Sequence, residues 1–266
     1  MTVAAGTAVR SPLAVTAAVW RAIFLREALD RLFDMRAAWL WLLMEPIMHI
    51  GFLSFLYAGF GLRVIGGIDT VTWVIVGMLG FFLFRRTAIQ TMHGVDSNGP
   101  LFAYRQVKPF DTAIVRAGLE AFLMAIASLV IVFAASMLTH PIIPADPVLV
   151  LAAAFGLWLF GLGYGLIASV LMELVPEAEH ILKLVMMPLY LVSGAIWPLA
   201  TIPPVYRELL MINPIAHGLE LIRQGFAPHY HMVPGVDLGY LYLWSIASLL
   251  LGLLLFRRFG RELVMK

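Results

Sequence analysis

The amino-acid sequence predicts an all-α integral membrane protein with six transmembrane helices. Apolar residues of the set AVILMFWYC make up 62% of its 266 residues, whereas soluble domains contain about 45–50%. Charged residues make up 13%, against about 25% in an average soluble domain. A soluble fold of this size needs more polar groups to cover its surface, so both figures indicate that lipid covers most of the chain.

Six apolar runs provide the third observation, because a helix needs about 20 apolar residues to cross a bilayer. The predicted spans are 37–60, 64–84, 118–138, 148–172, 184–202 and 238–256. The second is the weakest, since Asp69 interrupts it and leaves only 70–84 free of charge. Long runs without alternating polar residues favour helices over barrel strands. We therefore treat 1–266 as a single transmembrane domain.

The distribution of cationic residues predicts the orientation. With the N-terminus inside, 15 of the 18 Lys and Arg residues lie in inner segments, and only Arg63, Arg207 and Arg223 lie outside. The positive-inside rule therefore predicts that both termini are cytoplasmic.

Residues 1–36 predict a cytoplasmic amphipathic helix rather than a signal peptide, because no apolar region follows a basic start. Apolar residues recur at three- and four-residue steps on one face, and Glu27, Asp30, Arg31 and Asp34 occupy another. The apolar positions are Ala18, Ala22, Leu25, Leu29 and Leu32. Such a helix lies along the inner leaflet. A helix packed on the chain's own cytoplasmic ends is an equally good interpretation.

The first span carries ionisable residues at a membrane depth where they are costly. Glu45 and His49 are spaced to pair, and Trp41, Phe52 and Leu56 share their helical stripe, with Tyr57 among the surrounding aromatic residues. The stripe predicts either the wall of a translocation path or a polar contact between helices. We favour the first because aromatic residues are dense here.

An inner segment, 96–109, predicts a short helix that Asn98 and Pro100 begin and Pro109 ends. Its exposed apolar and aromatic side chains indicate docking into a partner's groove or, equally, burial in the lipid interface. They are Leu101, Phe102 and Tyr104, beside Arg105. In the third span Glu120 lies near the inner end, and we expect it only to reach toward the membrane surface.

The fourth and fifth spans contain small residues and prolines. Gly161 and Gly165 form a GxxxG pair, which predicts close helix packing. The fifth span is predicted to break around Pro188, Gly194 and Pro198. A stripe along it comprises Lys183, Met187, Tyr190, Gly194 and Trp197, and a proline-rich outer segment, 203–237, follows.

No catalytic or nucleotide-binding motif is present in the sequence. Cysteine is absent, and none of the three lysines follows the glycine that a phosphate-binding P-loop requires. His229 and His231 have no third ligand in view, so no metal site is predicted. The net charge of +2 is too small to indicate nucleic-acid binding. Uphill transport therefore needs energy from a partner or an ion gradient.

Residues 187–198, which read MPLYLVSGAIWP, are followed by Ile202-Pro203-Pro204 and by NPIAHGLELIR at 213–223. Together with Glu45-Pro46 and His49 and the six spans, this order resembles the permease subunits of type-2 ABC exporters. Within that family it is most similar to the capsular-polysaccharide (KpsM-like) branch. The resemblance covers nearly the whole chain.

The resemblance implies a transport subunit, not an enzyme, in the bacterial inner membrane. Two copies form the channel, and two copies of a cytoplasmic ATPase carry ATP and Mg²⁺. The cargo is a lipid-linked polysaccharide, and periplasmic and outer-membrane adaptor proteins are expected partners. Segment 96–109 matches the coupling helix that rests on the ATPase, through Leu101, Phe102, Tyr104 and Arg105.

The resemblance also implies roles for other residues. The translocation path is assigned to Trp41, Glu45, His49, Phe52, Tyr57, Lys183, Met187 and Tyr190. The periplasmic gate is assigned to Gly194, Trp197, Pro198, Asn213, Pro214, His217, Glu220 and Arg223. Binding of the lipid anchor's phosphate is assigned to Arg31, Arg36, Arg85 and Arg86. The positive-inside rule also explains the position of these arginines.

Three alternatives compete with a polysaccharide exporter permease. The same fold could export O-antigen, teichoic acid, a drug or haem. Loss of surface capsule in a deletion strain would distinguish a capsular polysaccharide from these cargoes. An ion-coupled secondary transporter generally has repeated halves with several midplane ionisable residues, and this sequence has one pair and no repeat. A membrane scaffold leaves the broken fifth span unexplained.

Overall fold

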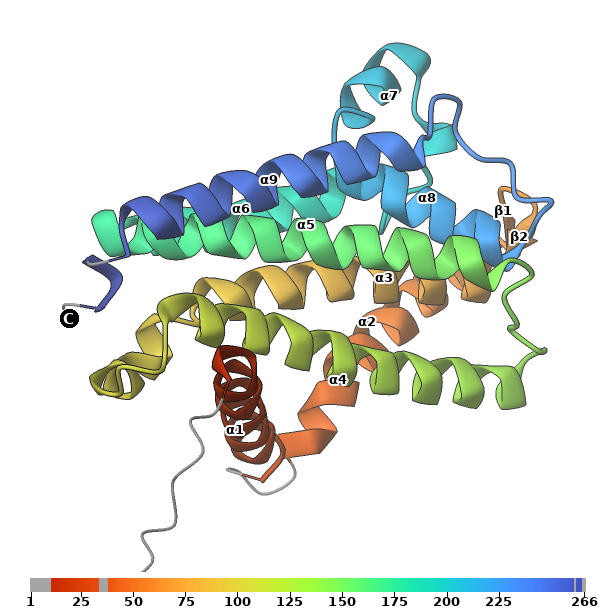
Figure 1. Ribbon diagram of the computed structural model, residues 1–266. Helices are drawn as coiled ribbons and strands as arrows, with labels where there is room; N and C mark the ends of the chain where they lie inside the picture. The colour runs from red at the N-terminus through yellow and green to blue at the C-terminus, as the bar shows by residue number, and fades with distance from the viewer. Residues whose placement is uncertain (1–10, 34–37, 261, 265–266) are drawn as a thin grey trace, which may run out of the picture.

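The computed structural model describes residues 11–33, 38–260 and 262–264 (Figure 1). In this described part five helices are long and apolar enough to cross a membrane. They are α2 (Ala38–Gly59), α3 (Thr70–Met92), α4 (Pro109–Leu138), α5 (Pro147–Leu174) and α9 (Leu238–Arg258). The predicted all-α membrane fold is confirmed.

Helix α3 lies at the centre of the bundle. In its most apolar stretch 78% of the residues are buried, against 17% in α2 and in α9. Figure 1 shows α9, α5, α3 and α4 packed one beside the next. A Cβ atom at Gly161 or Gly165 of α5 would lie 2.8 or 2.4 Å from atoms of α3. The close packing that the GxxxG pair predicts is therefore confirmed.

The second span begins later than predicted. Residues before Thr70 form a small antiparallel hairpin of β1 (Val64–Ile65) and β2 (Ile68–Asp69). Asp69 then caps α3, because its carboxylate accepts from the backbone nitrogen of Thr72 at 3.0 Å. The charge that weakened this span in the sequence therefore marks its start, and the helix continues to Met92.

The fifth span is broken as predicted, at Gly194. Helix α6 (Ala178–Val192) contains Pro188 and has 15 residues, or about 22 Å at 1.5 Å per residue, which is shorter than a bilayer core of about 30 Å. Gly194 follows with φ of 74°, a left-handed conformation that favours glycine. Residues 184–202 are thus not one continuous helix, and six complete spans remain a prediction.

Short elements follow this break. They are η2 (Leu199–Thr201), α7 (Pro204–Leu210) and α8 (Pro214–Phe226). Helix α7 projects from the bundle, whereas α8 packs against α3, α5 and α9. Every residue of α8 except Gln224 and Phe226 is buried. The segment predicted as an outer gate therefore includes a buried helix.

Helix α1 (Pro12–Phe33) lies across α4 near one end of the bundle (Figure 1). The segment η1 (Asp96–Ala103), η3 (Glu262–Val264) and the end of α9 lie at that same end, and the β1–β2 hairpin lies at the other. We call these the α1 end and the hairpin end. Leu25 and Leu29 are 50% and 57% exposed, while Ile23 and Glu27 are buried. Of the residues predicted on the charged face of α1, Glu27 and Arg31 therefore turn toward the protein, whereas Asp30 is exposed and Asp34 lies outside the described residues.

Candidate functional site

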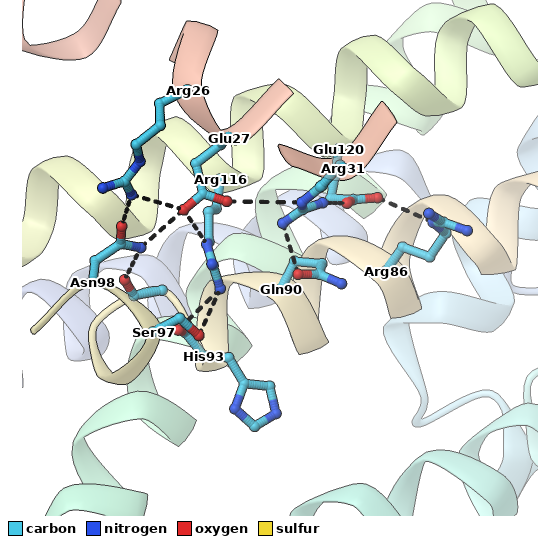
Figure 2. Close-up of polar contacts among 11 residues, drawn as sticks. Arg26, Glu27, Arg31, Arg86, Gln90, His93, Ser97, Asn98, Arg116 and Glu120 are labelled. Carbon is cyan, nitrogen blue, oxygen red and sulfur yellow. Dashed lines mark hydrogen bonds and ion pairs between the residues drawn. The ribbon is translucent and has the colours of Figure 1, made fainter. Parts of the chain in front are cut away.

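A network of polar side chains lies at the α1 end, between α1, α3, η1 and α4 (Figure 2). Glu27 of α1 is only 5% exposed, and its carboxylate accepts from Arg116 Nε and Asn98 Nδ2, each at 3.0 Å. Arg116 also donates to the backbone oxygen of His93 at 3.0 Å, and Arg26 donates to the side-chain oxygen of Asn98. One buried carboxylate thus joins α1 to η1 and α4.

Glu120 of α4 is the second carboxylate of this network, and it is fully buried. Arg86 of α3 donates to it from Nε at 3.0 Å, and Arg31 of α1 pairs with its other oxygen (Figure 2). Arg31 also donates to Gln90 of α3 at 2.7 Å. Because a buried carboxylate without a cation is strongly destabilising, Glu120 holds α1, α3 and α4 together.

Glu45 of α2 is the third carboxylate, and Arg85 and Arg86 of α3 both donate to it. Since Arg86 bridges Glu45 and Glu120, the network continues to the half-exposed side of α2. The predicted side-chain pair of Glu45 with His49 is wrong. His49 Nδ1 lies 2.9 Å from the backbone oxygen of Glu45, while the carboxylate turns toward the arginines.

This network carries an excess of positive charge. Its five arginines, Arg26, Arg31, Arg85, Arg86 and Arg116, face three glutamates. Burial by itself raises the pKa of Glu27, but Arg116, Asn98 and Arg31 outweigh it and hold that pKa below its usual value. Burial and the neighbouring Arg116 lower the pKa of Arg31 to about 10, so Arg31 is charged at neutral pH. The site therefore attracts anions.

Three of the four arginines predicted at the anchor's phosphate, Arg31, Arg85 and Arg86, are brought together in this network. The fourth, Arg36, lies outside the described residues. Sequence reasoning missed Glu120, which was expected only to reach the membrane surface. The signal that points to it is an ionisable side chain beside a long apolar run, where lipid exposure is costly.

On α2 the predicted path residues divide into two groups. Trp41 and Phe52 are 66% and 64% exposed, and His49 is exposed too. The His49 ring centroid lies 6.4 Å from that of Tyr190, so α2 and α6 meet here. The assignment of Tyr57 to the path is corrected, because its side chain is buried. It is 3% exposed, and its hydroxyl donates to the backbone oxygen of Ile196.

On α6 the predicted path residues also divide. The ring of Tyr190 is half-buried 4.8 Å from that of Phe81, and its hydroxyl donates to Met78 Sδ at 3.2 Å. Met187 is 67% exposed, and Lys183 forms an exposed ion pair with Glu179 at 2.5 Å. We define the α2–α6 face by the predicted path residues of these two helices that are at least partly accessible, apart from Lys183, which is paired with Glu179. It comprises Trp41, Glu45, His49, Phe52, Met187 and Tyr190.

The predicted coupling helix is shorter than expected. A 3₁₀ helix covers Asp96–Ala103, and Pro109 begins α4 instead of ending a helix, because proline suits the first helical position. Leu101 and Phe102 are half-buried, and Phe102 packs against a core cluster. In contrast, Tyr104 is 67% exposed and Arg105 is also exposed. Of the four predicted coupling residues, Tyr104 and Arg105 are therefore the exposed ones.

A second buried polar cluster lies toward the hairpin end. Arg223 of α8 is fully buried, lies 3.7 Å from the ring centroid of Trp73, and donates to Glu220 and to the backbone oxygen of Gly194, each at 2.9 Å. Tyr230 donates to Glu220 at 3.0 Å, and burial raises the pKa of Tyr230 to about 12. The cluster therefore ties the break after α6 to α3 and α8.

The other predicted gate residues have local structural roles. The Asn213 side chain caps α8 by accepting from Ile215 at 3.0 Å, and the buried His217 accepts from the backbone nitrogen of Asp237 at 3.0 Å. Pro214 begins α8, and Pro198 is buried beside Gly194. Trp197 differs from these, because it is 50% exposed. Of the predicted gate set, Trp197 is exposed, Asn213 is half-buried and the others are buried.

A bundle of long helices with an apolar outer surface, and with buried charged groups toward both ends, defines a multi-pass membrane protein. The chain belongs to the ABC-2 type transporter family, which it matches over residues 18–227. The family resemblance drawn from the sequence is therefore confirmed.

Curated relatives match nearly the whole chain. It is 32% identical to the polysialic acid transport protein KpsM of Escherichia coli over 249 residues, which cover 93% of this chain and 96% of KpsM. It is 26% identical to the capsule polysaccharide export inner-membrane protein CtrC of Neisseria meningitidis serogroup A, over 90% of both chains. It is 24% identical to the capsule polysaccharide export inner-membrane protein BexB of Haemophilus influenzae, over 96% of both.

Proposed function

We propose that this chain is the permease subunit of an ATP-driven exporter that moves lipid-linked capsular polysaccharide outward across the bacterial inner membrane. The observation that carries the proposal is the similarity to KpsM, CtrC and BexB over at least 90% of the chain. Two copies form the channel, and each binds one cytoplasmic ATPase subunit that carries ATP and Mg²⁺. Both termini, and with them the α1 end, face the cytoplasm.

The network at the α1 end supports a way to transmit force from the ATPase. The ATPase contacts the accessible groups Tyr104 and Arg105, which follow η1 directly. Within η1, Asn98 is bonded to Glu27, and Glu27 is bonded to Arg116. Because removing one partner of a buried ion pair costs about 3–5 kcal/mol, α1, η1 and α4 move as one unit.

The α2–α6 face supports a role as one wall of the translocation path, which a second copy completes. Its aromatic rings offer flat apolar surfaces on which sugar rings can stack, and His49 and Glu45 offer hydrogen bonds to hydroxyl groups. Arg86 connects Glu45 of this face to Glu120 inside the bundle. A displacement at the α1 end therefore reaches the path through α3.

The excess positive charge around Glu45 supports a role in receiving the cargo's lipid anchor. Arg85 and Arg86 are partly accessible, with side chains 27% and 19% exposed. Guanidinium groups bind phosphate oxygens through parallel hydrogen bonds, so an anchor phosphate competes with Glu45 for these donors. The anchor then enters at the α2–α6 face while the polysaccharide occupies the path.

Replacing Tyr104 with Ala and Arg105 with Glu tests the coupling role without disturbing the core. We expect the tagged variant to lose most of the ATPase that co-purifies with the parent chain in detergent, because an exposed cation and an aromatic anchor are removed together. Surface capsule should fall in parallel when the variant is the cell's only copy. Quantitative co-purification and capsule staining measure the two effects.

Arg257→Glu is the matched control, because Arg257 is exposed near the α1 end but lies on α9. It should retain both the ATPase and the capsule. If the parent chain recovers no ATPase at all, the proposed class of exporter is contradicted. If a deletion strain keeps its capsule, the cargo is a different one.

A further inference from the structure

An apolar groove lies between α1, α4 and α5. Its volume is about 460 Å³. The lining side chains come from three helices and are apolar apart from Arg21. They include Trp20, Phe24, Ile114, Val115 and Trp158, with Gly118 between them. None of these helices carries a predicted path residue, so the groove is separate from the α2–α6 face.

The polar atoms of the two tryptophans are already bonded within the protein. Trp20 Nε1 donates to Asp111 at 2.8 Å, and Trp158 Nε1 donates to the backbone oxygen of Ala117 at 2.8 Å. Both indole rings therefore offer only apolar surface to the groove. A ligand that fills it has to be apolar along the buried part of its length.

The groove is continuous with exposed apolar side chains of α1 and α4. Leu25 of α1 is 50% exposed, and Phe122 and Ile126 of α4 are 53% and 42% exposed. Phe122 also contacts Phe24 in the groove, with ring centroids 6.0 Å apart. An acyl chain passing over this surface of the protein can therefore enter the groove without crossing a polar barrier.

Arg21 supplies a charge next to this apolar space. It is exposed, and within the described residues no ion pair neutralises it. It lies on α1, the helix that we place along the surface of the membrane. A cation at this level attracts anionic lipid headgroups, at about 1 kcal/mol per residue in general.

We propose that the groove binds one anionic phospholipid of the surrounding leaflet. Its acyl chain lies between Trp20, Phe24 and Trp158, and its phosphate lies at Arg21. The lipid fills the space between α1 and the membrane-spanning helices, and it thereby helps to hold α1 against them. The inference does not depend on the cargo, since it uses only the membrane placement of the chain.

Gly118→Leu is the direct test, because no atom lies within 4 Å of a Cβ built at this residue. The added side chain enters the groove without displacing protein. Native mass spectrometry of the full chain in detergent, titrated with dioleoyl phosphatidylglycerol or dioleoyl phosphatidylcholine, measures the bound lipid. We expect phosphatidylglycerol to bind about tenfold more weakly to Gly118→Leu than to the parent chain.

Arg21→Gln tests the headgroup separately, and as a substitution at an exposed residue it leaves the fold intact. It should weaken the binding of phosphatidylglycerol about fivefold and leave the binding of phosphatidylcholine unchanged. Ala134→Leu adds nearly as much bulk to an exposed residue of α4 away from the groove, and it should leave the binding of both lipids unchanged. Unchanged lipid binding by Gly118→Leu would overturn the proposal. An equal loss of lipid binding in Ala134→Leu would also overturn it. So would dissociation of a dimer by Gly118→Leu, since the groove would then hold a second copy of the chain.

Discussion

At the scale of single residues, Glu120 shows how a side chain's role depends on its neighbours in space. It lies at the start of the third apolar run, where a carboxylate can reach the membrane surface. In the structure it is fully buried, because Arg31 and Arg86 approach it from α1 and α3. These partners are 89 and 34 residues away in sequence, so no local pattern predicts them.

Replacing Glu120 with Ala should lower the free energy of unfolding by about 3–5 kcal/mol, because two largely buried guanidinium groups lose their shared carboxylate. Thermal unfolding of the purified chain in detergent measures the change. Asp30→Ala is the control, since Asp30 is an exposed acid on α1, and it should change stability by no more than about 0.5 kcal/mol. Equal unfolding temperatures for Glu120→Ala and the parent chain would show that this ion-pair network does not stabilise the fold.

At the scale of elements, α1 is held by Glu27 and Arg31 and not by Leu25 and Leu29. Leu25 and Leu29 face outward, where lipid covers them, while Glu27 is bonded to Arg116 and Asn98. The sequence predicts the helix correctly, since it follows from periodicity, but it places Asp30 on the face of Glu27, and Asp30 is exposed. Which side faces the protein depends on Arg116 and Asn98, which belong to other elements.

Acidification should release α1 from the bundle. The pKa of Glu27 is below its usual 4.5, so its carboxylate contributes its full stabilisation above pH 4.5 and loses it as the pH falls through the lower pKa of the folded state. Hydrogen exchange in α1, corrected for the intrinsic rate at each pH, should therefore accelerate below pH 4.5.

Glu27→Gln should exchange about 10- to 100-fold faster than the parent chain already at pH 7, since charged hydrogen bonds contribute about 1.5–3 kcal/mol. Its corrected exchange should then vary little with pH. Asp30→Asn, on the exposed side of the same helix, should behave like the parent chain. Identical exchange of α1 in Glu27→Gln and the parent would refute the assignment.

At the scale of the whole molecule, the two ends of the bundle differ in chemistry. The α1 end holds the arginine-rich network and the exposed Tyr104 and Arg105, whereas the hairpin end holds the cluster of Arg223, Glu220 and Tyr230. An excess of arginine on one side is the usual mark of the cytoplasmic face. This asymmetry is the physical basis for the orientation that we propose.

Single cysteines test that orientation directly, because the chain contains none of its own. Gln106 follows η1 at the α1 end, and Glu208 lies on α7 beyond the break in the fifth span, and both are exposed. A membrane-impermeant maleimide should label Glu208→Cys in intact cells and Gln106→Cys only after lysis. The reverse result would invert the molecule in the membrane.

The membrane class, the family, most of the apolar helices and the break at Gly194 can all be predicted from the order of the residues. These follow from hydrophobic length, backbone chemistry and motif order, which are properties of neighbouring residues. The packed structure is needed to show that Tyr57 and Arg223 are buried, that Glu45 faces Arg85 rather than His49, and that Glu27 points inward. Each of these depends on which distant helix supplies a charge or a backbone oxygen, and packing in three dimensions alone determines that.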